Sequence, residues 1–203
     1  MNAGIVSLHW DNIDARIPHY QQLVFEHLNI PLTQHKIDRL DHGEWMDWVL
    51  ERSQDLDVVV FFDVDCIPVD ATKTHEHIKL AKWGHLVGNM QAANHIDPRK
   101  TYAGPSFMCV NLQMWRALGK PSSKAYWGGD VGQMLTDTWR HHGKPVFLLP
   151  PTHVEEPRWD LPEQPNAFGI GTTFGEANYH LFECRTDKNI DRFVERANSV
   201  LDW

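Results

Sequence analysis

The chain has 203 residues, of which 42% are hydrophobic and 23% charged, so we expect residues 1–203 to form a single globular domain. Its formal net charge of −8 argues against nucleic acid as a partner, because binding a polyphosphate backbone needs a basic face. A small molecule that carries phosphate is not excluded, because a bound cation can reverse the local sign of the charge.

Charges interrupt every apolar run, so no segment approaches the roughly 18 residues of a membrane-spanning helix. The N-terminus (MNAGIVSLHWDN) has neither a basic region nor an extended apolar stretch, and we therefore expect no signal peptide. The three cysteines have no C-x-x-C spacing, which predicts buried, reduced thiols. Together these features predict a cytoplasmic protein.

The first half of the chain alternates strand and helix patterns. Residues 57–62 (DVVVFF) are mostly β-branched or aromatic and are apolar on both faces, as in a central parallel strand. Asp41 and Glu44 have capping-box spacing ahead of a helix that carries Trp45. The other elements expected here are a strand over 4–8, a helix from Pro18, a helix over 71–83 ended by Gly84, and strands over 85–90 and 106–110.

In the second half of the chain, Asp130 precedes an apolar stripe with i, i+3, i+4 spacing, which is typical of a helix. A strand is expected over 146–149, and residues 150–175, rich in Pro and Gly, are expected to form a long loop. A last helix carries an apolar face that includes Phe193 and Ala197. The alternation predicts an α/β fold with a largely parallel sheet, in which ligands bind at the carboxyl ends of the strands.

Asp63 and Asp65 come directly after the most strand-like segment. In an extended backbone, residues i and i+2 point the same way, and two close carboxylates repel unless a cation or a shared proton relieves them. Carboxylate ligands suit Mg²⁺ or Mn²⁺, which complete their coordination with water and substrate phosphates. The alternative is that both residues cap the following loop or helix, but a carboxylate pair at the exit of a buried strand favours a metal site.

The segment VVVFFDVDCIPVD resembles the D-x-D metal-binding motif of glycosyltransferases with the GT-A fold, in the nucleotide-diphospho-sugar transferase superfamily. The resemblance implies a Rossmann-related α/β sandwich with a mainly parallel central sheet flanked by helices. It also implies a Mn²⁺ or Mg²⁺ cofactor and a nucleotide-sugar donor, for which a UDP-sugar is the family's common choice. The acceptor is not identified by the sequence, a glycan being one candidate.

The resemblance also implies roles for particular residues. Tyr102–Cys109 resembles the segment that lines the donor-sugar site, and the WGGD sequence at 127–130 resembles the acidic motif that opens the acceptor-side helix. His180 is placed like a C-terminal His that supplies a further metal ligand, with His153 a competing candidate. The implied site has metal ligands Asp63, Asp65 and His180, the catalytic residue Asp130, and substrate-binding residues Ser7, His9, Asp11, Gly104, Pro105, Ser106, Gly128 and Gly129.

Asp130 has two interpretations. As a general base it would deprotonate an acceptor hydroxyl if the reaction inverts the anomeric centre, and it would position the substrate if the configuration is retained. As an N-cap it would only accept backbone N–H bonds at the start of the helix. The sequence is compatible with both.

Two other functions fit parts of the pattern. A haloacid-dehalogenase-type phosphatase also has a strand followed by D-x-D, but Ile67 stands where that family has Thr or Val, and GGDVGQM lacks the later acidic pair. A non-catalytic GT-A-like domain would bind a glycan or nucleotide-sugar without turnover. The short chain favours this last reading, and the intact D-x-D motif argues against it.

Overall fold

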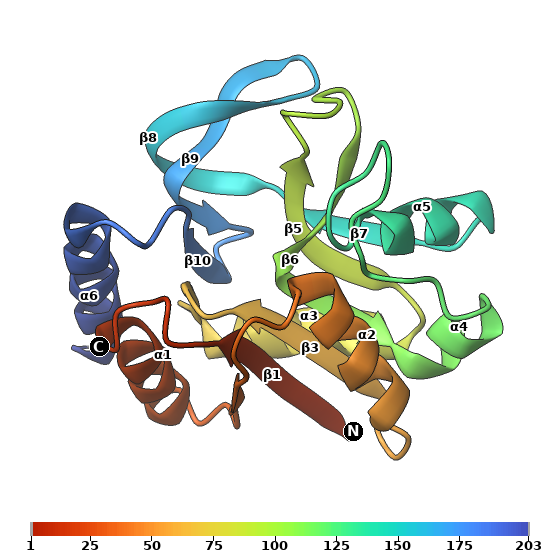
Figure 1. Ribbon diagram of the computed structural model, residues 1–203, viewed down its shortest axis with the longest axis horizontal. Helices are drawn as coiled ribbons and strands as arrows, with labels where there is room; N and C mark the ends of the chain where they lie inside the picture. The colour runs from red at the N-terminus through yellow and green to blue at the C-terminus, as the bar shows by residue number, and fades with distance from the viewer. Residues whose placement is uncertain (1, 203) are drawn as a thin grey trace.

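A six-stranded mixed sheet forms the centre of the protein in a computed structural model that describes residues 2–202 (Figure 1). Within these residues only β6 is reversed, because it pairs antiparallel with β3 and β5 while the other neighbours in the sheet are parallel. The predicted α/β fold with a mainly parallel sheet is therefore confirmed. The spatial order is β2 (Thr33–Lys36), β1 (Ala3–His9), β3 (Val58–Asp63), β6 (Thr101–Asn111), β5 (Leu86–Ala92) and β7 (Val146–Leu149).

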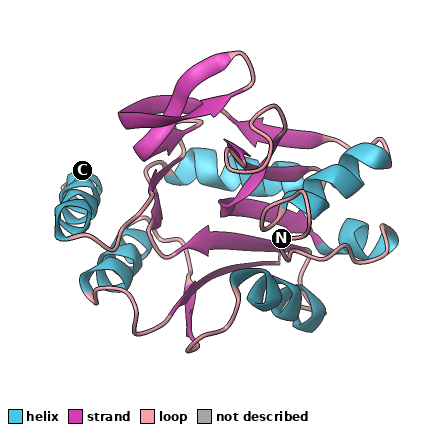
Figure 2. Ribbon diagram, turned by 45° about the horizontal axis from the view of Figure 1, so that its top comes forward, coloured by secondary structure: helices cyan, strands magenta, loops and turns pink. Residues whose placement is uncertain are grey.

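Both faces of this sheet are covered by helices, as Figure 2 shows. On β3, Val60 and Phe62 pack in the same core as Phe25 and Ile78, whereas Phe61 packs on the opposite face with helices of the other layer. This alternation on a fully buried strand is the reason the segment is apolar at every position. One core includes side chains of α1 (Arg16–His27) and α3 (Ala71–Lys82), and the other includes side chains of α2 (His42–Arg52), α4 (Leu112–Ala117) and α5 (Gln133–His141).

A second, four-stranded antiparallel sheet lies beside the carboxyl end of β3 (Figure 1). Strand β10 at its centre pairs with β4, which follows β3 after a short turn, so the two sheets are joined at this turn. The C-terminal helix α6 (Asp187–Leu201) packs against α1 next to this sheet. The order of strands is β4 (Cys66–Pro68), β10 (Asn178–Leu181), β9 (Gln164–Phe174) and β8 (Pro151–Leu161).

The expectation of a loop over residues 150–175 is wrong, because this segment forms the β8–β9 hairpin. Pro151 and Pro157 are tolerated because β8 is an edge strand of the sheet, where proline costs no ladder hydrogen bond on the open side. Gly169 is required by close packing, since a Cβ there would lie 2.1 Å from the Glu156 carbonyl oxygen. The prolines in this segment therefore indicate an edge strand, and Gly169 indicates a close approach of two backbones.

The interpretation of Asp130 as a helix N-cap is also wrong. Helix α5 begins at Gln133, and its N-cap is Gly132 in a left-handed conformation (φ +79°). By contrast, the Asp41 carboxylate accepts a bond from the Glu44 backbone N–H at 3.0 Å, as the capping-box spacing predicts. None of the helices described in residues 2–202 is long and apolar enough to cross a membrane.

Candidate functional site

The turn after β3 is held in place by hydrogen bonds from two directions. The buried Gln21 of α1 donates to the backbone oxygens of Asp63 (2.7 Å) and Cys66 (2.9 Å). From the other side, the Leu181 backbone N–H donates to the Asp65 carbonyl at 3.0 Å. The turn between the sheets is thus fixed by residues distant in the sequence.

This arrangement brings Asp63, Asp65 and His180 together. One ligand atom from each residue lies within 4.8 Å of the others, and His180 Nε2 lies 3.2 Å from Asp65 Oδ1 and 3.7 Å from Asp63 Oδ2. His180 reaches the pair because β10 places it opposite Cys66 in the β4–β10 register. Two carboxylate oxygens and one imidazole nitrogen form a donor set that fits a divalent cation such as Mn²⁺.

The surroundings shift the pKa values of the two carboxylates in opposite directions. Burial raises the pKa of Asp63, and the Asp65 charge adds to this effect while His42 and His180 oppose it. Burial also acts to raise the pKa of Asp65, but the charge and hydrogen bond of His180, together with the Cys184 thiol bond, lower it overall. Two carboxylates this close differ in their affinity for a proton, and a bound cation would favour the charged form of both.

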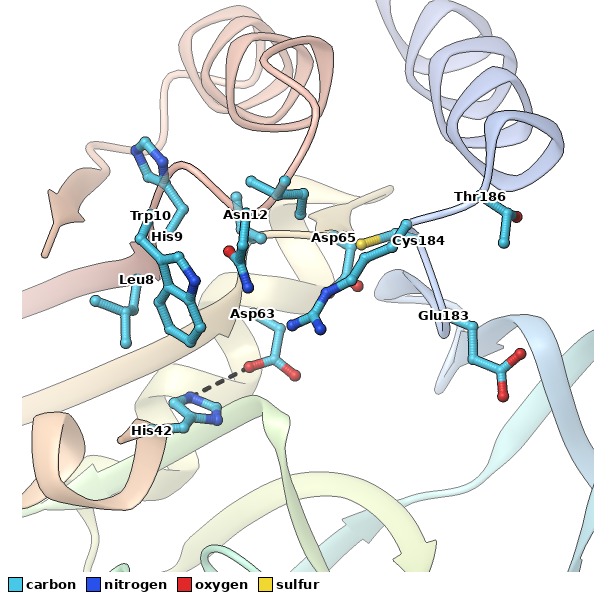
Figure 3. A pocket seen from close by; sticks show the side chains of 13 residues that line it. Leu8, His9, Trp10, Asn12, His42, Asp63, Asp65, Glu183, Cys184 and Thr186 are labelled. Carbon is cyan, nitrogen blue, oxygen red and sulfur yellow. Dashed lines mark ion pairs between the residues drawn. The ribbon is translucent and has the colours of Figure 1, made fainter. Parts of the chain in front are cut away.

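A cavity of about 490 Å³ opens beside the carboxylate pair (Figure 3). Its volume is within the range of small-molecule sites in proteins. The walls come from the end of β1, the start of α2, the D-x-D turn and the segment between β10 and α6. The lining residues are Leu8, His9, Trp10, Asn12, Ile13, His42, Asp63, Val64, Asp65, Glu183, Cys184, Arg185 and Thr186.

Of the three residues predicted near the first strand, His9 lines this cavity. Burial, followed by the charge of Lys36, lowers the pKa of His9. Ser7 is fully buried, and within residues 2–202 its Oγ has no hydrogen-bond partner. Asp11 lies at the surface, where its Oδ1 is 2.6 Å from Lys36 Nζ.

The predicted donor-sugar segment lies on β6, outside the residues that line the cavity. Ser106 is fully buried, and its Oγ accepts bonds from Asn89 Nδ2 (3.0 Å) and Gln91 Nε2 (3.1 Å). Gly104 lies against Gln91, because a Cβ at Gly104 would be 2.3 Å from that side chain. Pro105, between them, is half-buried.

Asp130 lies in a second polar group that includes Tyr102. The Tyr102 hydroxyl donates to Asp130 Oδ2 at 3.2 Å, and Asp130 Oδ1 accepts the Val131 backbone N–H at 2.8 Å. Burial raises the pKa of Tyr102, and the charges of Asp130 and Asp63 raise it further. The hydrogen bond from Tyr102 therefore fixes one oxygen of the Asp130 carboxylate.

Gly128 and Gly129 precede Asp130 in a tight turn. Tyr126 and Gly129 exchange backbone hydrogen bonds of 2.9 and 3.0 Å, and Gly128 has φ +96°, a conformation that strains residues with a side chain. The adjacent Trp127 is fully exposed at the tip. His153, the competing metal candidate, is exposed on β8 and lies outside the three-residue cluster.

Sequence reasoning missed His42. Its Nε2 lies 3.3 Å from Asp63 Oδ1, as the dashed line in Figure 3 shows. His42 is the first residue of α2, and no local pattern connects it with the D-x-D segment. Only the presence of a histidine directly after a predicted N-cap could have drawn attention to it.

No protein-family model matches the sequence, and no curated protein matches it. A mutant of the Drosophila β1,4-galactosyltransferase 7, solved with manganese, UDP-Gal and xylobiose, is similar over 72% of this chain, with a TM-score of 0.51 and 14% identity. The chain has the GT-A fold. It spans 64% of the length of that galactosyltransferase chain.

A second similar structure is a putative nucleotide-diphospho-sugar transferase from Desulfovibrio desulfuricans G20. The similarity covers 73% of this chain and 80% of that one, with 12% identity and a TM-score of 0.48. The GT-A fold expected from the D-x-D resemblance is thus confirmed by the galactosyltransferase comparison, and the D-x-D pair lies at the carboxyl end of a central strand of this fold.

Proposed function

We propose that this single-domain protein is a metal-dependent glycosyltransferase that moves a sugar from a nucleotide-sugar to an acceptor. The observation that carries the proposal is the cluster of Asp63, Asp65 and His180 on a GT-A fold, two of whose members line a cavity of about 490 Å³. Mn²⁺ or Mg²⁺ is the proposed cofactor, and a UDP-sugar is the proposed donor.

The cavity supplies the chemistry that a nucleotide-sugar requires. A divalent cation held by the cluster would stabilise the negative charge of the leaving diphosphate. Arg185 lines the cavity and would contribute a second positive charge. Trp10, whose indole lies along the wall in Figure 3, offers a flat surface against which a base can stack.

Asp130 is proposed to act on the acceptor. In an inverting reaction its carboxylate would accept the proton of the acceptor hydroxyl, while the hydrogen bond from Tyr102 keeps the carboxylate oriented. In a retaining reaction the same contacts would position the acceptor. The exposed Trp127, next to the Gly128–Gly129 turn, offers an apolar face to a sugar ring, which supports a carbohydrate acceptor.

Thermal unfolding with UDP-, GDP-, CMP- and TDP-sugars, each with and without Mn²⁺, tests the proposal. We expect stabilisation by one nucleotide class and only with the metal, by about 2.7 kcal/mol at a ligand concentration of about a hundred times its Kd. A panel without any shift would contradict the donor site. Metal-dependent hydrolysis of a simple phosphate ester would favour the phosphatase instead, and metal-dependent binding without transfer would favour a binding domain.

A further inference from the structure

We propose that His42 is a positioning residue of the metal centre, which holds one oxygen of Asp63 so that the other oxygen faces the cation. The inference rests on the proposed metal site and assigns a new residue to it. His42 would bind neither the cation nor the substrate directly.

The two oxygens of Asp63 face different imidazoles. Oδ1 lies 3.3 Å from His42 Nε2, and Oδ2 lies 3.7 Å from His180 Nε2. His180 belongs to the group whose ligand atoms lie within 4.8 Å of one another, whereas His42 is not a member of that group. His42 is therefore a neighbour of one ligand, on the side away from the cluster.

Packing from the protein interior fixes the orientation of the His42 ring. The ring stacks on Trp45, with centroids 5.6 Å apart and planes inclined by 24°. Trp45 is itself fully buried, and its Nε1–H donates to His35 Nδ1 at 2.8 Å. Because these contacts hold the face of the ring, its Nε2 edge is presented to Asp63 at the cavity wall, where the His42 side chain is 28% exposed.

The contact matters because Asp63 is the last residue of β3 and its side chain is 24% exposed. A carboxylate at such a position can rotate unless its second oxygen has a partner. Outer partners of metal ligands fix the orientation of those ligands, and removing one typically lowers metal affinity by roughly 10- to 100-fold. His42 is the partner that the structure supplies for Asp63 Oδ1.

Binding of Mn²⁺ alone, followed by the electron paramagnetic resonance signal of free Mn²⁺ without nucleotide, tests this role independently of activity. We expect His42→Ala to weaken Mn²⁺ binding by roughly 10- to 100-fold. His42→Gln should restore much of the affinity, because its amide N–H can reach the same oxygen. His141→Ala, an exposed histidine at the end of α5, is the matched control and should bind as the wild type does.

A double-mutant cycle with Asp63→Asn separates positioning from a general effect on the fold. If His42 acts through Asp63, His42→Ala should cause no further loss of Mn²⁺ affinity in the Asp63→Asn background. An equal further loss in that background would overturn the proposal. Thermal unfolding of each apo variant shows whether the fold is retained.

Two other results have distinct meanings. If His42→Ala binds Mn²⁺ as tightly as the wild type but binds the nucleotide-sugar more weakly, then His42 contacts the donor and the positioning role is wrong. If the wild type itself does not bind Mn²⁺, the proposed metal centre is wrong. The proposed function and the role of His42 are then both contradicted.

Discussion

Asp65 is the member of the carboxylate pair that interacts most closely with its surroundings. Its Oδ1 lies 3.2 Å from His180 Nε2, and its side chain is 15% exposed, less than that of Asp63. Although burial acts to raise its pKa, His180 and the Cys184 thiol lower that pKa overall. These contacts hold it as an anion beside a second carboxylate, an arrangement that costs free energy without a cation. Asp65 should therefore contribute much to metal binding and little to stability.

We expect Asp65→Ala to abolish metal-dependent donor binding and to change the free energy of unfolding by less than about 1 kcal/mol, because relief of the repulsion from Asp63 offsets the lost interaction with His180. Calorimetric titration of the nucleotide-sugar with and without Mn²⁺, together with urea unfolding, measures both effects. Asp38→Ala is the control, because that carboxylate is 69% exposed and paired only with Arg39 in the structure of residues 2–202. Unchanged donor affinity in Asp65→Ala would contradict the metal site.

Gly128 and Gly129, which precede Asp130, differ in the reason that a side chain would be unfavourable there. A Cβ on Gly129 would lie 2.1 Å from Tyr126 Cε1, so Gly129→Ala must displace the ring and break the Tyr126 hydroxyl bond to Asp137 (2.8 Å). We expect a loss of about 1–3 kcal/mol in urea unfolding. Gly128→Ala meets no atom within 4 Å and should cost only the strain of its positive φ, about 1 kcal/mol. Equal losses in the two variants would contradict this account of the turn.

At the scale of the element, α6 supports the D-x-D turn from behind. Phe193, fully buried on α6, belongs to the same apolar cluster as Ile17 of α1 and Val64, which lies between the two aspartates. The helix therefore stabilises the region from which the Asp63, Asp65 and His180 cluster is built. Helix α6 packs through its buried apolar face, which includes Ile190, Phe193 and Ala197.

We expect Phe193→Ala to lower the free energy of unfolding by about 3–5 kcal/mol, because a large buried side chain leaves a cavity. Asn198→Ala on the same helix should stay within about 0.5 kcal/mol of the wild type, because Asn198 is exposed. Chemical unfolding of the two variants makes the comparison. A small loss for Phe193→Ala would mean that α6 packs weakly on α1.

At the scale of the whole molecule, the half-buried Tyr126 and the buried Tyr102 and Tyr179 link stability to alkaline pH. Burial raises the pKa of Tyr126 to about 12, with the Asp137 bond adding to it, and burial also raises the pKa of Tyr102 and Tyr179. A group with a raised pKa in the folded state contributes stability that is complete below its unfolded pKa and is lost as pH rises through the folded value.

The free energy of unfolding should therefore be constant with respect to these tyrosines below pH about 10 and should fall between about 10 and 12. Phenolate absorbance should show that these tyrosines ionise late in the native protein and together on unfolding. Tyr126→Phe should remove part of the pH dependence in this window. A stability that rises with pH above 10 would contradict the assignment.

Patterns within single segments determined much of this protein. Strand β3 is apolar on both faces because it is covered on both sides, and Asp41 caps α2 through its own neighbour Glu44. The three cysteines are buried and unpaired, as their spacing predicts. Each of these features depends on residues close together in the sequence or on the apolar pattern of one strand. They can therefore be predicted from the sequence.

Only the tertiary structure decided which residues meet. Pairing of β10 with β4 brings His180 to the D-x-D turn, and packing of Trp45 brings His42 to Asp63, although neither residue is near the turn in the sequence. The hairpin over 150–175 likewise depends on the position of β8 at the edge of the second sheet, which no local sequence pattern predicts. Local propensity depends on neighbours along the chain, whereas these contacts depend on strand register and helix packing between distant segments.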